Sequence, residues 1–291
     1  MTPIIQNFAQ ISDRYDAVFC DLWGVVHNGV APFDDAVAAL QQFRAKGGRV
    51  ILLTNAPRPR AAVRRQIERI GVADDCWDDI VTSGDASQNA MAAGLAGTRV
   101  HHIGPEKDAS FFTDVPRDID VSHIERVPLD QAEGIICTGL FDDLTETPED
   151  YRETFLYAKT KGLKLLCTNP DIVVDFGEKR LFCAGALAKL YTQMGGESIY
   201  FGKPHPPIYD LARKRLRAFQ PVDDARIMAI GDGILTDIPG GLAEGLDTLF
   251  VTGGLEADEF GPDRNAPDPA LLNGWLERQQ LSPTAAISFL R

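Results

Sequence analysis

Short apolar runs along this chain alternate with segments in which apolar residues recur at helical spacing. The runs are rich in Val, Ile and Leu, which is typical of strands covered on both faces. Between two of them, Phe33, Val37, Leu40 and Phe43 recur at the spacing of a helix. The first part of the chain is expected to hold strands at 18–20, 49–54 and 80–83 and helices at 33–46, 60–70 and 85–95. This order of elements predicts a doubly wound parallel sheet.

The middle of the chain shows a second series of elements, and the first pattern resumes after residue 181. In the middle we expect strands at 99–103, 124–127, 134–138 and 164–168 and a helix at 151–161. Later we expect strands at 198–201, 226–231 and 248–251, the last of the chain, and helices at 184–194, 206–219 and 269–277. The prediction is an α/β protein with a Rossmann-like core of residues 1–90 and 185–291 and an inserted α/β domain of residues 91–184.

Composition narrows the class of protein. A length of 291 residues with 44% hydrophobic residues suits two packed domains. The formal charge of −13 argues against nucleic acid or an anionic membrane as a partner, and no apolar run reaches the length of a membrane span. The five cysteines lack metal-binding and redox-motif spacing, so we expect buried free thiols in a cytoplasmic protein. The sequence leaves open whether the chain is a monomer or a homodimer.

Polar residues follow several of the expected strands at the same end. They are Asp21, Thr54, Asn55, Lys203, Asp232 and Asp237. Because the carboxyl ends of parallel strands meet at one edge of a sheet, these residues are expected to form one site. Its three carboxylates repel one another unless a cation lies among them, and Mg²⁺ prefers such oxygen ligands. A carboxylate nucleophile, a metal, a hydroxyl and a lysine together can hold and transfer a phosphoryl group.

Four motifs in this order resemble those of the haloacid-dehalogenase superfamily. They are Asp-Leu-Trp-Gly-Val at 21–25, Leu-Thr-Asn at 53–55, Gly-Lys-Pro at 202–204 and Gly-Asp-Gly-Ile-Leu-Thr-Asp at 231–237. Thr-Asn-Pro-Asp at 168–171 and the runs around the last two motifs resemble class IIA, the N-acetylglucosamine-phosphate and 4-nitrophenyl phosphatases. The first motif resembles a subgroup of that class with this same Trp. The class carries a large α/β cap where we expect the inserted domain.

The resemblance implies a role for each residue of the expected site. Asp21 would be the nucleophile that forms an aspartyl-phosphate, and Thr54 with Asn55 would bind the phosphoryl group. Lys203 would neutralise the charge that this group shares with the nucleophile. Mg²⁺ would be bound by Asp21, the main-chain carbonyl of Trp23, Asp232 and Asp237. The implied activity is hydrolysis of a small phosphorylated metabolite by a Mg²⁺-dependent phosphatase.

Trp23 departs from the pattern of the phosphatases, which usually have an aspartate there as general acid and base. Tryptophan has no titratable group, so proton transfer to the leaving group is unassigned. His27 is close enough in sequence to supply the proton, although we prefer a turn histidine. Two rival functions stay open: a dehalogenase that uses Asp21 without metal, and a weakened protein that binds phosphorylated metabolites. Arg58 either meets the substrate or begins a solvated helix.

Overall fold

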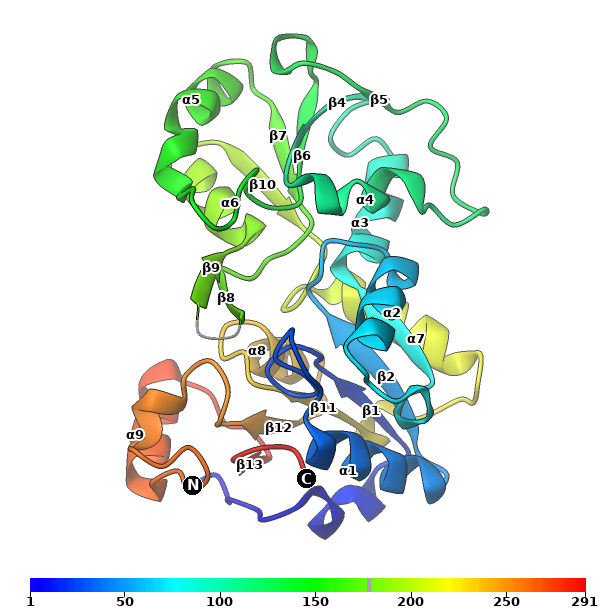
Figure 1. The fold of residues 1–291 in the computed structure, drawn as a ribbon, viewed down its shortest axis with the longest axis vertical. Coiled ribbons are helices and arrows are strands. Elements are labelled where there is room, and N and C mark those ends of the chain that lie inside the picture. The colour runs from blue at the N-terminus through cyan, green and yellow to red at the C-terminus, as the bar shows by residue number, and fades with distance from the viewer. Residues whose placement is uncertain (177–178) are drawn as a thin grey trace.

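The computed structural model of this chain describes residues 1–176 and 179–291, and most of its strands lie in two separate parallel sheets (Figure 1). The first sheet has six strands in the order β13-β12-β11-β1-β2-β3. They are β1 (Ala17–Cys20), β2 (Arg49–Thr54), β3 (Asp79–Thr82), β11 (Ile227–Gly231), β12 (Asp247–Val251) and β13 (Ala285–Ile287). The helices packed on this sheet are α1 (Asp34–Ala45), α2 (Arg60–Arg69), α7 (Pro206–Arg217), α8 (Asp237–Ala243) and α9 (Pro269–Gln279).

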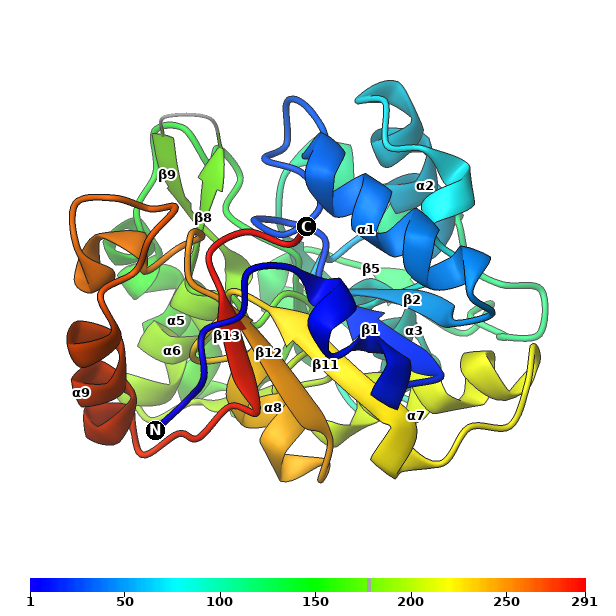
Figure 2. The same ribbon diagram turned by 90° about the horizontal axis from the view of Figure 1, so that it is seen from below.

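Successive residues of the central strands point to opposite faces of the first sheet, and both faces are covered. In β1, Val18 and Cys20 pack in the same cluster as Leu40 of α1, whereas Ala17 and Phe19 pack on the other face with residues of α7. Figure 2 shows α1 and α2 on one side of the sheet and α7 and α8 on the other. Burial on both faces explains why these strands are almost continuously apolar in sequence.

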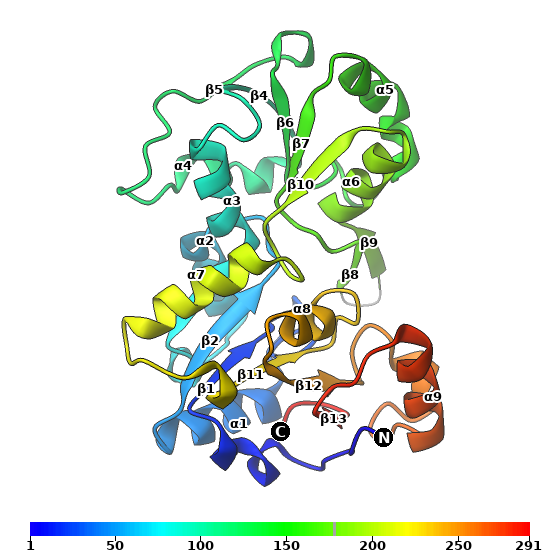
Figure 3. The same ribbon diagram turned by 180° about the vertical axis from the view of Figure 1, so that it is seen from behind.

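The second sheet has five strands in the order β10-β7-β6-β4-β5, again all parallel. They are β4 (Arg99–Ile103), β5 (Glu125–Arg126), β6 (Gly134–Cys137), β7 (Lys164–Cys167) and β10 (Glu197–Tyr200). α5 (Arg152–Thr160) and α6 (Ala184–Gln193) cover one face, and α3 (Ser83–Ala92) and α4 (Ser110–Thr113) cover the other. Seen from behind, α3 lies between the two sheets, and it contacts strands of both (Figure 3).

Short 3₁₀ segments complete the helical structure. They are η1 (Phe8–Gln10), η2 (Ser12–Arg14), η3 (Asp74–Cys76), η4 (Glu106–Asp108), η5 (Leu129–Gln131), η6 (Pro148–Tyr151), η7 (Asp224–Arg226) and η8 (Ala257–Phe260). Among the residues that the structure describes, no helix combines the length and the apolar character that crossing a membrane requires.

Three parts of the strand pattern differ from the sequence prediction. The strand expected at 198–201 in the first sheet is β10, which pairs with β7 in the second sheet. The strand expected to be the last, β12, is followed by β13, which pairs with it in parallel. An antiparallel hairpin of β8 (Val173–Phe176) and β9 (Lys179–Phe182) has no counterpart in the prediction. The doubly wound α/β class itself is confirmed.

The strand order of the first sheet reverses direction between β1 and β11, which are neighbours. Cys20 lies opposite Ile230, and the amide of Asp21 donates to the Ile230 carbonyl at 2.8 Å. The two strands therefore end side by side, and each is followed directly by an aspartate, Asp21 and Asp232. In open α/β sheets, ligands bind at such a reversal, outside the carboxyl ends of the strands.

Candidate active site

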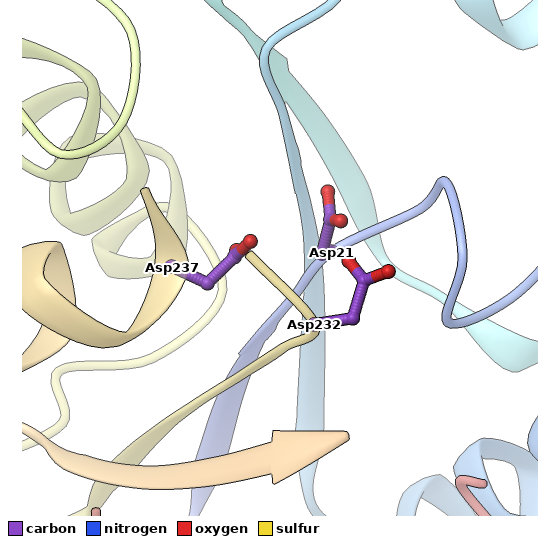
Figure 4. A group of neighbouring side chains, drawn as sticks. All are labelled: Asp21, Asp232 and Asp237. Atoms are coloured by element: carbon purple, nitrogen blue, oxygen red, sulfur yellow. The ribbon is translucent and has the colours of Figure 1, made fainter. Parts of the chain in front are cut away.

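Three aspartates gather at the reversal point of the first sheet. Asp21 follows β1, Asp232 follows β11, and Asp237 is the first residue of α8. Each offers a carboxylate oxygen within 4.8 Å of the other two, and all three residues are buried. Figure 4 shows Asp21 and Asp232 next to each other, with Asp237 pointing at them from α8. The cluster expected from the sequence is therefore present in the fold.

Lys203 lies against two of these aspartates. Its Nζ is 2.6 Å from Asp21 Oδ1 and 2.7 Å from Asp237 Oδ1, and only 2% of the residue is exposed. Burial opposes the charge of the ammonium, but Asp21 and Asp237 outweigh burial and hold the pKa of Lys203 well above its usual range. The lysine is therefore a fixed positive charge beside the oxygen of Asp21.

One lysine does not balance three carboxylates. Burial, followed by the charge of Asp237, raises the pKa of Asp21 well above its usual range. Burial and the same neighbour raise the pKa of Asp232 to about 7, although the amide of Leu255 donates to its Oδ2 at 3.0 Å. A divalent cation would remove this excess of negative charge, and a set of carboxylate oxygens suits Mg²⁺ or Ca²⁺.

Two glycines make room for the carboxylate of Asp232. A Cβ on Gly24, which has φ +81°, would lie 2.3 Å from Asp232 Oδ2, and a Cβ on Gly254 would lie 2.0 Å from the same atom. Real side chains do not approach so closely, so both positions require glycine. The backbone thus forms a cradle around Asp232 Oδ2. Both this cradle and the set of carboxylate oxygens fit a bound cation.

Thr54 and Asn55 lie at the end of β2 on the same side. Both are buried, and Thr54 lines the adjacent cavity. The Asn55 amide clasps the backbone of Lys203: its Oδ1 accepts from Lys203 N at 2.7 Å, and its Nδ2 donates to Lys203 O at 3.1 Å. The same Nδ2 donates to Asp171 Oδ1 at 2.8 Å. Asn55 therefore positions the lysine and links the site to the segment after β7.

Trp23 and His27 form the wall of the site next to Asp21. Trp23 Nε1 donates to the Asp175 carbonyl of β8 at 2.5 Å, and its ring meets the His27 ring edge-on with centroids 5.1 Å apart. Burial lowers the pKa of His27 to about 4, and its Nδ1 accepts from Gly29 N at 2.9 Å. His27 is therefore neutral at ordinary pH and has the features of the turn histidine that we preferred.

A cavity of about 540 Å³ opens beside the cluster, between the two sheets. Leu22, Trp23 and Thr54 line it from the first sheet, and Thr138 and Asp171 line it from the second. An enclosed space of this size next to a charged cluster is a typical small-molecule site. One end of a ligand can thus lie at the cluster while the rest of it occupies the cavity.

The structure brings together all of the residues that the sequence predicts to form the site. What the prediction lacks are contacts between loops far apart in the chain, namely Asn55 with Asp171, Leu255 with Asp232, and Arg58 with Asp108. Arg58 was an open candidate on its own, but no spacing in the sequence indicates its partner. These pairs form only because the fold brings their loops together.

Comparison with known proteins identifies the class. A sequence profile of the haloacid dehalogenase-like hydrolases matches residues 18–116, and a HAD-hydrolase-like profile matches residues 200–273. A crystal structure of a hydrolase of the haloacid dehalogenase-like family from Brucella suis superposes with a TM-score of 0.86. It is 40% identical in sequence and covers 99% of this chain and 100% of that chain. The chain belongs to the haloacid dehalogenase-like hydrolases, as its four motifs predicted.

Some relatives within this family are named for a phosphatase activity. The D-glycerol 3-phosphate phosphatase of Mycobacterium tuberculosis is 28% identical over 250 residues, which cover 85% of this chain. The match spans only 65% of the length of that relative. A structure of the glycerol phosphate phosphatase of the same organism in complex with magnesium has a TM-score of 0.63 and 25% identity, over 87% of this chain and 73% of that chain.

Proposed function

We propose that this protein hydrolyses small phosphomonoesters with Mg²⁺ as cofactor and Asp21 as nucleophile. The observation that carries the proposal is the Lys203 ammonium, held between Asp21 and Asp237 with Asp232 beside them, at the reversal point of the sheet. This arrangement places a carboxylate oxygen, a fixed cation and a metal-binding set within one small volume. A relative of this chain is named as a phosphatase, which supports the same class of reaction.

Each group has a defined task in the proposed reaction. A carboxylate oxygen of Asp21 attacks phosphorus, the ester P–O bond breaks, and the alcohol leaves with a proton taken from solvent. Water then attacks the phosphorus of the aspartyl-phosphate, so that phosphate leaves and the carboxylate of Asp21 is restored. Lys203 offsets the negative charge that develops on the transferring group, and Thr54 donates its hydroxyl to a phosphoryl oxygen.

The donor set and the glycine cradle fit a divalent cation. Asp21 and Asp232 would hold it together with the main-chain carbonyl of Trp23, and Asp237 would support it from the start of α8. Bound there, Mg²⁺ supplies positive charge to the phosphoryl oxygens. The residues of the chain would orient Asp21 and exclude bulk water.

Two further assignments accompany this function. We infer that the second sheet is a cap that closes over Asp21, with residues 91–184 as its main part and β10 and α6 added to it. Its two connections to the core, through α3 and after β10, are the geometry that hinge closure needs. We also infer a reducing compartment such as the cytoplasm, because all five cysteines are buried and free.

Hydrolysis of 4-nitrophenyl phosphate tests the proposal. We expect turnover with Mg²⁺, loss of turnover with excess EDTA, and a fall of about a thousandfold or more in kcat for Asp21→Asn. Asp16→Asn is the matched control, because Asp16 is a partly exposed acid before β1 that pairs with Arg226.

The same assay separates the rival functions. Release of halide from 2-haloacids that persists in EDTA would identify a dehalogenase. Binding of phosphate esters with no turnover, and with no difference between wild type and Asp21→Asn, would identify a binding protein. Either result would refute the phosphatase proposal.

A further inference from the structure

We propose that Arg58 and Asp108 form the subsite that recognises the alcohol part of the substrate, and that this part is an uncharged polyol or sugar. The inference rests on the proposed function for the position of the phosphoryl group. It adds the residues that select the substrate and the chemical class that they accept.

Arg58 is fixed by its surroundings. Pro57 and Pro59 flank it in the segment that leads into α2, and its Nη2 donates to Gln66 Oε1 at 2.6 Å. Its Nε lies 3.4 Å from Asp108 Oδ1, yet this atom is buried and makes no hydrogen bond. A buried donor without a partner is destabilising, so a ligand that accepts a hydrogen bond from this atom would be favoured.

Asp108 approaches from the second sheet. It ends η4, which follows β4, and only 3% of the residue is exposed. Burial raises the pKa of its carboxyl to about 6 in spite of the opposing charges of Arg58 and Lys107. Arg58 therefore follows a strand of the first sheet and Asp108 a strand of the second, and both side chains line the cavity. Because Arg58 Nε makes no hydrogen bond to Asp108, the pair can still bond a ligand.

The second sheet has a reversal point of its own at this place. Its strand order reverses at β4 and β6, and the two strands end at Ile103 and Cys137. Just beyond β6, the Thr138 hydroxyl lies 2.9 Å from His102 Nε2 on β4. Both sheets therefore direct the carboxyl ends of their strands at the same cavity, where ligands of open α/β sheets bind. A phosphoryl group at Asp21 leaves the alcohol part of its ester between these two edges.

The charges around the cavity favour a neutral group. Within the described part of the chain, the charged residues that line it are Arg58, Arg69, Lys107, Asp108, Asp143 and Asp171, three basic and three acidic. A hydroxyl accepts from the Arg58 guanidinium and donates to the Asp108 carboxylate at the same time. A second anion would be repelled by Asp108 and Asp143, and a cation by Arg58 and Lys107. Two vicinal hydroxyls can bond Arg58 and Asp108 at the same time.

The experiment compares two esters of equal size. Glycerol 3-phosphate ends in a hydroxymethyl group, and 3-phosphoglycerate has a carboxylate at that position; 4-nitrophenyl phosphate has no hydroxyl. Dissociation constants are measured by calorimetry with Ca²⁺, and kcat/KM is measured with Mg²⁺. For the wild type we expect about 10- to 100-fold tighter binding of glycerol 3-phosphate than of 3-phosphoglycerate, because one charge-assisted hydrogen bond is worth that factor.

The variants locate the selectivity. Asp108→Asn removes the repulsion between Asp108 and the carboxylate of 3-phosphoglycerate, so the preference for glycerol 3-phosphate should fall about 10-fold or more. Arg58→Gln should weaken the binding of glycerol 3-phosphate by about 10-fold. Both should affect 4-nitrophenyl phosphate less than glycerol 3-phosphate, because 4-nitrophenyl phosphate has no hydroxyl to bond either residue. Asp130→Asn is the control, since Asp130 is an exposed acid of η5, between β5 and β6. Thermal unfolding checks that each variant is folded.

The outcomes separate this inference from the proposed function. A selectivity for the neutral ester that the two variants reduce supports the subsite, even if nothing is hydrolysed. Equal binding of the two esters by wild type, or a preference that Asp108→Asn leaves unchanged in folded protein, overturns it, even if 4-nitrophenyl phosphate is hydrolysed. A loss in both variants that is as large for 4-nitrophenyl phosphate as for glycerol 3-phosphate also overturns it, because the residues would then act on the phosphoryl end.

Discussion

The two sheets of this protein end at the same cavity, but the charge is unbalanced at the first edge and balanced at the second. At the edge of the first sheet, three buried aspartates share one buried lysine. At the edge of the second, Asp108 faces Arg58, which comes from the loop after β2, and Lys107 pairs with Asp143, so that charges are matched. Both edges lie at a reversal of strand order, and the side chains that follow the strands give each edge its charge.

The difference indicates how the work is divided. An edge with surplus negative charge binds a cation and, through it, an anionic substrate, which is what phosphoryl transfer needs. An edge with balanced charge has no net attraction for ions and selects by hydrogen bonds and shape. Changes at the first edge should therefore affect the rate of every substrate, and changes at the second should affect one substrate relative to another.

The strongest test of the first edge is Lys203→Met. It removes the charge next to Asp21 and keeps most of the buried aliphatic stem, so kcat/KM for 4-nitrophenyl phosphate should fall about 100- to 1,000-fold. All esters should lose the same factor. Lys46→Met is the control, because Lys46 forms an exposed pair with Asp13. A loss confined to glycerol 3-phosphate would contradict the proposed division between the two edges.

Asp232→Asn tests the metal site directly. The amide keeps the shape of the side chain but removes one charge from the cluster, so the dissociation constant for Mg²⁺ should rise about 10- to 100-fold in calorimetry without substrate. Asp108→Asn serves as the matched control at the second edge and should leave Mg²⁺ binding unchanged. Equal Mg²⁺ affinity in wild type and Asp232→Asn would remove this residue from the site.

The first edge could be predicted from sequence far better than the second, for a physical reason. Asp21 and Asp232 follow strands whose apolar runs are long enough to recognise, and parallel strands must end on one side. The contact of Arg58 with Asp108 joins two loops on different sheets, and no local pattern encodes it.

The missed strands have equally local causes. β10 has an ordinary strand sequence, but nothing in that sequence says which of two sheets it joins. β13 is a three-residue strand, Ala285-Ala286-Ile287, which is too short and too small in side chains to show a strand pattern. The position of such elements is decided by tertiary packing, in which β13 lies against β12 and is buried.

Each edge also holds a neutral histidine, buried in the case of His27 and half-buried in the case of His102, and the pair sharpens the comparison. Burial lowers the pKa of His27 at the first edge and of His102 at the second to about 4 in each case. Both imidazoles are unprotonated in the folded protein and bind a proton when it unfolds below about pH 6.5. The contribution of these two histidines to the free energy of unfolding should therefore decrease as the pH falls from about 6.5 to about 4.

Two substitutions isolate these contributions. His27→Asn keeps an acceptor for Gly29 N, and His102→Gln keeps a partner for Thr138. Each should reduce the loss of stability between pH 6.5 and 4 by about 2 kcal/mol in urea unfolding, and the exposed His123→Gln should not. An unchanged slope for His27→Asn would mean that folding does not lower the pKa of His27, which would make it a candidate proton donor again.

The smallest expected effect concerns Trp23, which occupies the position of the usual acid and base. If proton delivery to the leaving group is the weak step, 4-nitrophenyl phosphate should be cleaved far faster than glycerol 3-phosphate, because nitrophenolate needs little protonation. Trp23→Asp should raise the ratio of kcat/KM for glycerol 3-phosphate over that for 4-nitrophenyl phosphate about 10-fold. Absolute rates can fall, because the indole also bonds the Asp175 carbonyl and packs near Phe176.

Trp23→Phe is the matched control for this substitution. It keeps an aromatic ring against His27 and removes the same indole hydrogen bond, but it offers no acid. If the ratio rises in Trp23→Asp and not in Trp23→Phe, the missing proton donor explains the departure at this position. If both variants change the ratio equally, Trp23 acts through its contact with β8, and the cap controls substrate choice from the first edge as well. A ratio that stays fixed in folded Trp23→Asp would show that protonation of the leaving group does not limit the rate.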